Sequence, residues 1–295
     1  MHYNYQPVNS VEKIMLVNPR PFLNKRPLQS MVARRLCIGY NRGMKIETLH
    51  SWQVNVAQAL GIQRRLAEQV SRSNEVTSPR LIAGVDISVN RAEGTATGAV
   101  VVLNYPELRV VETKVVQGKL GFPYVPGLLS FREAPLILAA CQNLTVIPNL
   151  ILVDGQGIAH PRRMGLASHL GLFLDIPTIG CAKSRLCGSH EIPGEESGSY
   201  AEIVDVGETI GAALRTKPGT KPIFVSIGHK VDLESAVYWV LECCRGYRLP
   251  EPTRLAHLAA GGNLKQAKDT EVSTGIKQYS LVKELSVGKD ARVRG

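Results

Sequence analysis

Long hydrophobic runs are absent from this chain of 295 residues. The longest apolar stretches, such as Leu136 to Ala140, are far shorter than the roughly 20 residues that a membrane-spanning helix needs. No charged and then apolar leader opens the sequence, so we expect no secretory signal. The sequence therefore predicts a protein that has no membrane partner.

Paired cysteines are missing as well. The six cysteines are scattered, apart from the adjacent Cys243 and Cys244, and none has the C-x2-C spacing of a zinc site. Reduced thiols in a cytoplasmic protein are the better interpretation. Hydrophobic residues make up 44% of the chain and charged residues 20%, a composition that excludes global disorder and allows a sizeable core.

An excess of positive charge is missing from the central part of the chain. The net charge of +10 arises mainly at the two ends: residues 1–48 hold 8 Lys and Arg against 2 Asp and Glu, and residues 263–295 hold 7 against 4. Residues 49–262 hold 20 against 19. Overall basicity is therefore no argument for nucleic-acid binding by the central part, which must rest on individual residues.

These differences divide the chain into three parts. Residues 1–48 contain four prolines and no sustained apolar periodicity, so we expect a loosely ordered extension. Residues 263–295 are polar and lysine-rich and are expected to form a tail. One domain is expected at 49–262, and a chain that starts at Met44 should fold and act normally.

The central part predicts an α/β domain. Three consecutive strands with no helix between them indicate an antiparallel meander, and the alternation of strands and helices that follows indicates a mixed sheet flanked by helices. The predicted strands are 81–89, 97–103, 108–117, 150–154, 178–182 and 223–227, and the predicted helices are 52–70, 131–143, 163–174 and 233–244.

Three acids stand out by their positions. Asp86 lies inside an apolar strand, where an unpaired carboxylate is costly. Asp154 ends an apolar strand before a glycine-rich turn, at the edge where open α/β sheets bind ligands. Glu133 opens a helix after a proline-rich loop. Taken singly, each acid also has a purely structural interpretation. Asp86 could be a buried acid whose hydrogen bonds are all made, Asp154 a residue that begins a turn, and Glu133 an acid favoured by the helix dipole. Together they suit a hard cation such as Mg²⁺, which prefers carboxylate oxygens.

Six short stretches occur in an order that is typical of one family. Between about residues 50 and 260 the sequence resembles endonuclease V, whose fold is ribonuclease H-like. The stretches are Gly84–Ser88, Pro123–Glu133, Val153–Arg162, Gly180–Ser184, Gly228–Asp232 and Arg248–Arg254.

The resemblance implies a metal site and the residues around it. Asp86, Asp154 and Glu133 would be the acids that bind Mg²⁺, for which Mn²⁺ would substitute. Lys183 would lie near the scissile phosphate. The alternative is that Lys183 is only a solvated charge at the end of a strand. His160 would orient water or contact phosphate, or would be a loop histidine held in place by the neighbouring proline.

Three further residues lie in the last matched stretches or just beyond them. His257 matches an active-site position at which other members carry an acid, so its role is left open. His229 and Asp232 are assigned structural roles, and Asp232 fits the N-cap of the helix that follows.

The resemblance also implies how a base is read. Tyr124, flanked by prolines, would be a stiff wedge that fills the gap left by an extruded base. Gly127, Leu129, Gly165 and Leu186 would form the hypoxanthine pocket. The alternatives are purely structural: Tyr124 would pack on its own turn, Gly165 would allow close helix packing, and the two leucines would belong to the core.

The implied activity is metal-assisted nicking in nucleic-acid repair. The cut would fall at the second phosphodiester 3′ to deoxyinosine and leave 3′-hydroxyl and 5′-phosphate ends. DNA is the favoured substrate, RNA stays open, and we expect a cytoplasmic monomer. The alternatives are a ribonuclease H-like nuclease of other substrate and a non-catalytic inosine-binding module. The latter would not need Asp86, Glu133, Asp154 and Lys183 together.

Overall fold

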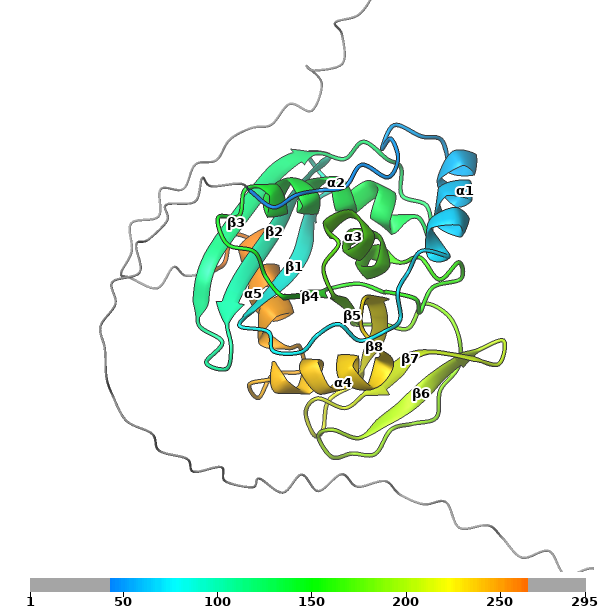
Figure 1. Ribbon diagram of the computed structural model, residues 1–295, viewed down its shortest axis with the longest axis vertical. Coiled ribbons are helices and arrows are strands. Elements are labelled where there is room, and N and C mark those ends of the chain that lie inside the picture. Colours follow the sequence, from blue (N-terminus) through cyan, green and yellow to red (C-terminus); the bar gives the residue numbers. More distant parts are fainter. Residues whose placement is uncertain (1–42, 265–295) are drawn as a thin grey trace, which may run out of the picture. The chain divides into compact units, whose positions relative to one another are not determined.

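The computed structural model describes residues 43–264, so the assignments for residues 1–42 and 265–295 lie outside it. Its centre is an eight-stranded sheet with the strand order β3-β2-β1-β4-β5-β8-β7-β6 (Figure 1). The strands are β1 (Leu81–Asn90), β2 (Thr95–Asn104), β3 (Val110–Lys119), β4 (Leu150–Val153), β5 (Thr178–Ala182), β6 (Tyr200–Asp205), β7 (Glu208–Leu214) and β8 (Ile223–His229).

Strand directions confirm the predicted mixed sheet. β1, β2 and β3 pair antiparallel as the expected meander. β1 pairs parallel with β4, and β4 pairs parallel with β5. β8 then runs antiparallel to β5 and to β7. The parallel pairs place the carboxyl ends of β1, β4 and β5 at one edge of the sheet, which is where ligands bind in open α/β sheets.

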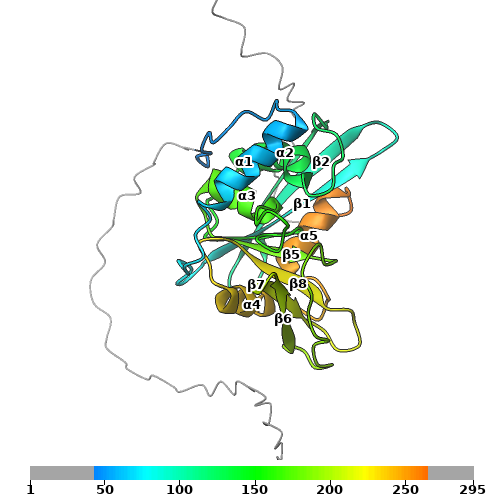
Figure 2. The ribbon, with the colours of Figure 1, turned by 90° about the vertical axis from the view of Figure 1, so that its right-hand side faces the viewer.

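Helices cover both faces of the sheet. Side chains alternate between the faces along a strand, so that Ala83 and Val85 of β1 pack in a cluster with α2 (Leu129–Gln142) and α3 (Leu166–Leu174). Ile82 faces the opposite cluster, which includes α4 (Leu233–Glu242) and α5 (Glu251–Ala260). In Figure 2, α1, α2 and α3 are gathered on a different side from α5. Within residues 43–264, none of the helices combines the length and the apolar character that a bilayer crossing requires.

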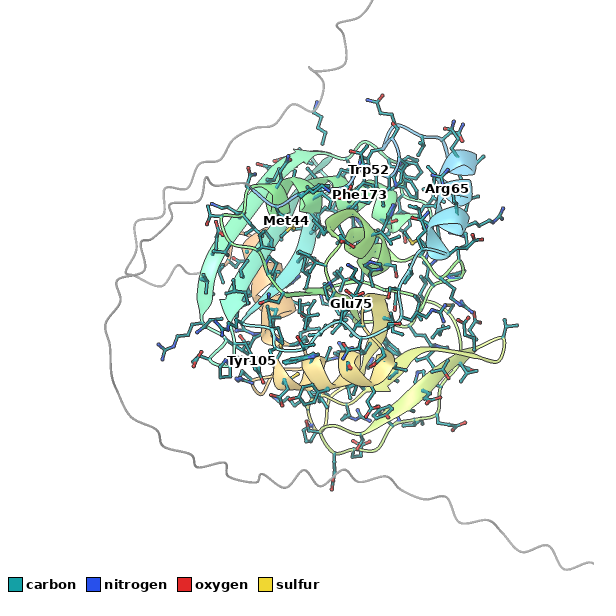
Figure 3. All side chains as sticks on the ribbon, viewed as in Figure 1. Met44, Trp52, Arg65, Glu75, Tyr105 and Phe173 are labelled. Carbon is teal, nitrogen blue, oxygen red and sulfur yellow. The ribbon has the colours of Figure 1, made fainter. Side chains whose placement is uncertain are left out.

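The first helix is shorter than the predicted 52–70. α1 (Val56–Ala67) begins with a capping box, in which Asn55 Oδ1 accepts a hydrogen bond from the Gln58 N–H and the Gln58 side chain accepts one from the Asn55 N–H. Trp52 lies before the helix and stacks on Phe173, with ring centroids 4.9 Å apart (Figure 3).

The described residues just before α1 contact the core. Met44 is buried in the cluster with α2 and α3, and the Glu47 N–H donates to the Phe173 carbonyl at 2.7 Å. A chain starting at Met44 therefore keeps both contacts.

Three elements were not predicted: β6, β7 and α5. The hairpin of β6 and β7 turns at Val206 and Gly207, which both have positive φ angles, whereas the usual sequence signal for such a turn is Asn-Gly or Asp-Gly. α5 follows a proline-rich stretch, and its own apolar pattern is too short to predict a helix. The predicted N-cap at Asp232 is confirmed, because its carboxylate accepts a hydrogen bond from the Ser235 N–H at 2.7 Å.

Candidate active site

Neighbouring parallel strands bring two of the predicted acids together. Val85 of β1 is in register with Val153 of β4, and the next residue in each strand direction is an aspartate. The Asp154 N–H donates to the Val85 carbonyl at 3.1 Å, which continues the pairing one residue past the end of β4. Asp86 and Asp154 therefore lie at the same edge of the sheet.

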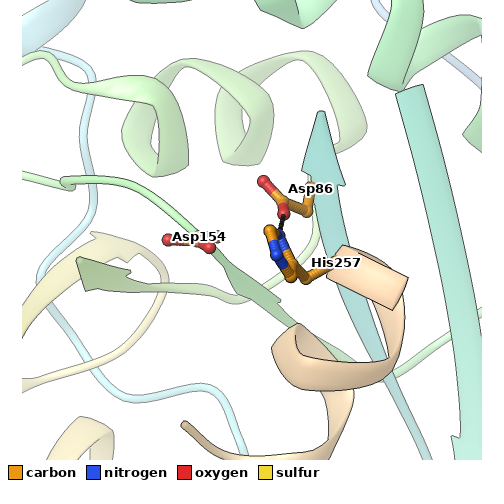
Figure 4. A group of neighbouring side chains, drawn as sticks. All are labelled: Asp86, Asp154 and His257. Carbon is orange, nitrogen blue, oxygen red and sulfur yellow. Dashed lines mark hydrogen bonds and ion pairs between the residues drawn. The ribbon is translucent and has the colours of Figure 1, made fainter. Parts of the chain in front are cut away.

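α5 adds a histidine to this pair. His257 Nδ1 lies 2.7 Å from Asp86 Oδ2, and ligand atoms of Asp86, Asp154 and His257 all lie within 4.8 Å of one another (Figure 4). Gly84 allows this approach, because a Cβ at that position would lie 1.9 Å from the Pro252 carbonyl oxygen of α5. The sequence left the role of His257 open, and the structure places its side chain next to the two carboxylates.

The two aspartates are poorly solvated and repel each other. Asp86 is 7% exposed, and its pKa is raised by burial and by the charge of Asp154, against the opposing hydrogen bonds from His257 and the Ile87 N–H. Asp154 Oδ2 is buried and forms an ion pair with Lys183 Nζ, and among the described residues it has no other polar partner. Lys183 follows β5 and thus reaches the site from the third parallel strand.

Glu133 lies close to the aspartates but outside the group of three. It is 8% exposed, on the first part of α2. Burial, followed by the negative charge of Asp86, raises its pKa to about 8, with a smaller contribution from Asp154. At pH 7 its carboxyl therefore binds a proton in this arrangement, and it is available to exchange that proton or to join a cation site.

This donor set fits a divalent cation. Burial and the charge of Asp154 disfavour the ionised form of Asp86, so this pair of carboxylates gains more from a bound cation than from each other. The residues that could hold the metal ion are Asp86, Asp154 and His257.

His160 is placed by different contacts from those expected. Its Nδ1 accepts a hydrogen bond from the Arg162 N–H at 3.1 Å, so in the neutral ring Nε2 has the proton and donates to the Gly127 carbonyl at 2.9 Å. Burial lowers its pKa to about 4, and so the ring is neutral at pH 7. These contacts orient His160 toward the loop that includes Gly127.

The residues assigned to base recognition are mostly accessible. Tyr124 is 71% exposed, Leu186 47% and Leu129 37%, so neither leucine belongs to the buried core. Gly165 is buried at the start of α3, and a Cβ there would lie 2.3 Å from the Gln156 carbonyl oxygen. Gly165 therefore permits close packing whatever else it does.

Two polar residues near Gly127 were missed by sequence reasoning. Gln63 of α1 is 1% exposed and donates to the Gly127 carbonyl at 3.0 Å. Arg162 Nη2 donates to the same oxygen at 2.7 Å. A glutamine in an amphipathic helix and an arginine beside a proline give no signal of such a contact, which depends on tertiary structure.

Known proteins are similar to this chain in both sequence and fold. Residues 64–258 match the family model described as Endonuclease V. Endonuclease V of Dehalococcoides mccartyi is 51% identical over 217 residues, which cover 74% of this chain and 97% of that protein. The crystal structure of endonuclease V from Bacillus subtilis is 34% identical and has a TM-score of 0.71, over 74% of this chain and 96% of that one.

A third similar structure contains nucleic acid. It is the Ciona intestinalis endonuclease V in complex with a DNA that contains an inosine followed by a ribo-adenosine, 31% identical with a TM-score of 0.62, over 71% of this chain and 96% of that one. The likeness to these structures confirms the ribonuclease H-like fold. With its motifs, its fold and its relatives in agreement, the chain belongs to the endonuclease V family.

Proposed function

We propose that this protein is a metal-dependent endonuclease of nucleic-acid repair that nicks a strand at the second phosphodiester 3′ to deoxyinosine. The observation that supports it most directly is the group of Asp86, Asp154 and His257 at the edge of the sheet, with Lys183 beside it. Mg²⁺ is the proposed ion and Mn²⁺ should substitute for it, because both accept oxygen ligands.

Each side chain near the metal site has a proposed task. Asp86 and Asp154 would hold the cation, and His257 is close enough to join them. When bound, the ion activates water and stabilises the charge that develops on a phosphodiester. Lys183, ion-paired with Asp154, supplies a positive charge for the phosphate that is cut. Glu133, whose pKa is about 8, holds or releases a proton near neutral pH.

Recognition of the base is proposed for the loops around Gly127. Tyr124 is exposed on a stiff turn and would enter the space left by an extruded base. Gly127, Leu129, Gly165 and Leu186 would surround hypoxanthine, whose 6-oxo group is an acceptor where adenine has a donor. A backbone N–H facing that oxygen would exclude adenine.

The substrate proposal is DNA, with RNA as a second candidate. The similar Ciona intestinalis protein was crystallised with DNA in which a ribo-adenosine follows the inosine, and on that basis we propose that this protein also accepts a ribonucleotide on the 3′ side of the lesion. We propose a monomer, in which one chain supplies all of the proposed site residues. The five cysteines within residues 43–264 are free thiols, which supports a cytoplasmic location.

One assay tests the function. Purified protein with Mg²⁺ is given matched DNA and RNA strands that contain a single hypoxanthine, and the cut is mapped on each. Cutting at the second phosphodiester 3′ to the lesion supports the proposal. Equal cutting of strands with guanine or adenine at that position would indicate a nuclease of another substrate, and binding without cutting would indicate an inosine-binding module.

A further inference from the structure

One carbonyl oxygen in the proposed lesion-reading loop accepts hydrogen bonds from three side chains. Gln63 Nε2 donates to the Gly127 oxygen at 3.0 Å, His160 Nε2 at 2.9 Å and Arg162 Nη2 at 2.7 Å. A carbonyl oxygen has two lone pairs, so this acceptor is saturated. Three separate segments of the chain thus converge on a single peptide group.

Gln63 connects the three segments. It is 1% exposed and uses all of its polar atoms: Nε2 donates to Gly127 and also to the Met164 carbonyl at 3.0 Å, and Oε1 accepts from Arg162 Nε at 2.5 Å. A buried amide in the middle of a helix is costly unless it is fully paired. Here the pairing is complete, and it ties α1 to the loop and to residues 162–164.

The peptide group held in this way belongs to a tight turn. The Leu128 N–H donates to the Val125 carbonyl at 2.9 Å, and Gly127 has a φ angle of +76°. Proline at the second position and a glycine with positive φ at the third are typical of a type II turn. The turn therefore has an internal hydrogen bond on one side and the three side-chain donors on the other, directly after the exposed Tyr124.

We propose that Gln63 is a positioning residue for lesion recognition, because together with His160 and Arg162 it fixes the Gly127 carbonyl and thereby the turn that presents Tyr124. This proposal rests on the proposed function, in which Tyr124 and Gly127 meet the damaged base. None of the three donors has to touch the substrate.

The energetic reason is preorganisation. A wedge that enters duplex nucleic acid must offset the cost of unstacking, which is a few kcal/mol, and a mobile loop would add the cost of ordering itself on binding. A turn held on both sides has lost that freedom before the substrate arrives. Loosening it should weaken substrate binding and leave the carboxylates and the chemical step in place.

The test compares two Gln→Glu variants of the full chain. Gln63→Glu keeps the size and the acceptor for Arg162 but removes both amide donors and turns a carboxylate oxygen toward the Gly127 carbonyl. Gln69→Glu makes the same change at an exposed position just after α1 and is the matched control. For each we would measure hydrogen exchange of the Leu128 amide without nucleic acid, and KM and kcat on hypoxanthine-containing duplex and single strands.

We expect Gln63→Glu to speed Leu128 exchange by at least about tenfold. KM for the duplex should rise by about tenfold, with a smaller rise for the single strand and kcat within about twofold of wild type. Gln69→Glu should match wild type throughout. Unchanged Leu128 exchange, or a loss confined to kcat, would overturn the proposal.

A second variant tests the proposal if the first does not fold. If Gln63→Glu fails to fold, Arg162→Lys retains the charge but cannot bridge Gln63 and Gly127 at once, and it should shift exchange and KM in the same direction. Exchange and KM that match wild type in this variant would reject the proposal. If the wild-type protein does not cut hypoxanthine strands at all, the proposed function fails, while Leu128 exchange still decides whether the three donors hold the turn.

Discussion

His257 Nδ1 lies 2.7 Å from Asp86 Oδ2, although 171 residues separate the two in the sequence. The contact joins the first strand of the sheet to α5, the last helix of the described residues. It places an imidazole where it can either bind a metal ion itself or orient the carboxylate that does. The two roles predict the same direction of change when the ring is removed.

His257→Ala should therefore raise the Mg²⁺ concentration needed for half-maximal nicking by about tenfold or more, the range found when groups that support metal ligands are lost. The measurement is a Mg²⁺ titration of the nicking rate. His190→Ala, on the loop after β5, is the matched control and should titrate like wild type. An unchanged Mg²⁺ requirement in His257→Ala would remove this residue from the metal site.

Asp154→Asn should abolish cleavage and leave binding of the hypoxanthine strand largely intact. The change removes a negative charge from the cation site, whereas the proposed base contacts lie elsewhere. Mg²⁺ should also raise the melting temperature of wild type, because it binds the folded state, and this rise should be lost in the variant.

Asp175→Asn is the control for that change. Asp175 has a φ angle of 52°, which asparagine tolerates well, and its partner is Lys230 at 2.8 Å, away from the site. It should nick normally and keep the Mg²⁺-dependent rise in melting temperature. Near-normal nicking by Asp154→Asn would show that Asp154 is not essential.

Tyr124→Ala should weaken binding of a lesion in duplex more than binding of a lesion in a single strand. Unstacking costs a few kcal/mol in a duplex and less in a single strand, so a wedge matters most in the duplex. Binding constants for the two substrates measure the difference. Tyr200→Ala, which removes an exposed tyrosine from β6, should affect neither, and equal losses on both substrates in Tyr124→Ala would make Tyr124 a packing residue.

The stability of the protein should fall as pH is lowered through the range below 6.5. His169 is fully buried, with Nδ1 2.9 Å from Ser130 Oγ and Nε2 2.7 Å from His50 Nε2, and burial lowers its pKa well below 6.5. Below pH 6.5 the unfolded chain binds a proton that the folded chain does not. The contribution of neutral His169 to the free energy of unfolding is thus complete above pH 6.5. Below that pH it falls by about 1.4 kcal/mol per pH unit.

The measurement is the free energy of unfolding of wild type and of His169→Gln between pH 5 and pH 7.5 (roughly one unit either side of the ordinary histidine pKa). Glutamine does not titrate, so the difference between the two proteins cancels the ionisable groups that do not contact His169 and reports on His169 together with its partner His50. The advantage of wild type should shrink as pH falls. An advantage that is constant across this range would contradict the assignment.

A chain starting at Met44 should fold and nick like the full chain. It keeps the buried Met44 side chain and the hydrogen bond of Glu47 to Phe173. A chain starting at His50 loses both and should be less stable by about 2 kcal/mol, the cost of exposing one methionine side chain. Denaturant unfolding of the three proteins checks this, and a Met44 chain that unfolds as early as the His50 chain would show that residues 1–43 stabilise the fold.

Sequence analysis predicted well the positions of those site residues whose neighbours in the sequence determine the local structure. Asp86 and Asp154 follow or interrupt apolar strands, and pairing between adjacent parallel strands then leaves little choice about where they meet. Glu133 could be placed on its helix but not at its distance from the aspartates. That distance depends on how α2 crosses the sheet, which no local pattern specifies.

Contacts between distant segments were harder to predict. The approach of α5 to β1 depends on Gly84 facing a backbone carbonyl of the helix, and Gln63 looks like any polar helix residue until its three partners are known. The edge strand β6 escaped prediction because much of it is exposed, so its sequence lacks the continuous apolar run of a central strand.

The position of His257 on the last described helix also sets an order of events during synthesis. Asp86, Glu133 and Asp154 leave the ribosome well before residue 257, so that β1, α2 and β4 have all been synthesised before His257. Until α5 has emerged and packed against Gly84, the group of two carboxylates and an imidazole cannot be complete. A partly translated chain therefore has the acids without the complete group of three, and we expect metal binding to reach its full strength only when nearly the whole domain has been made.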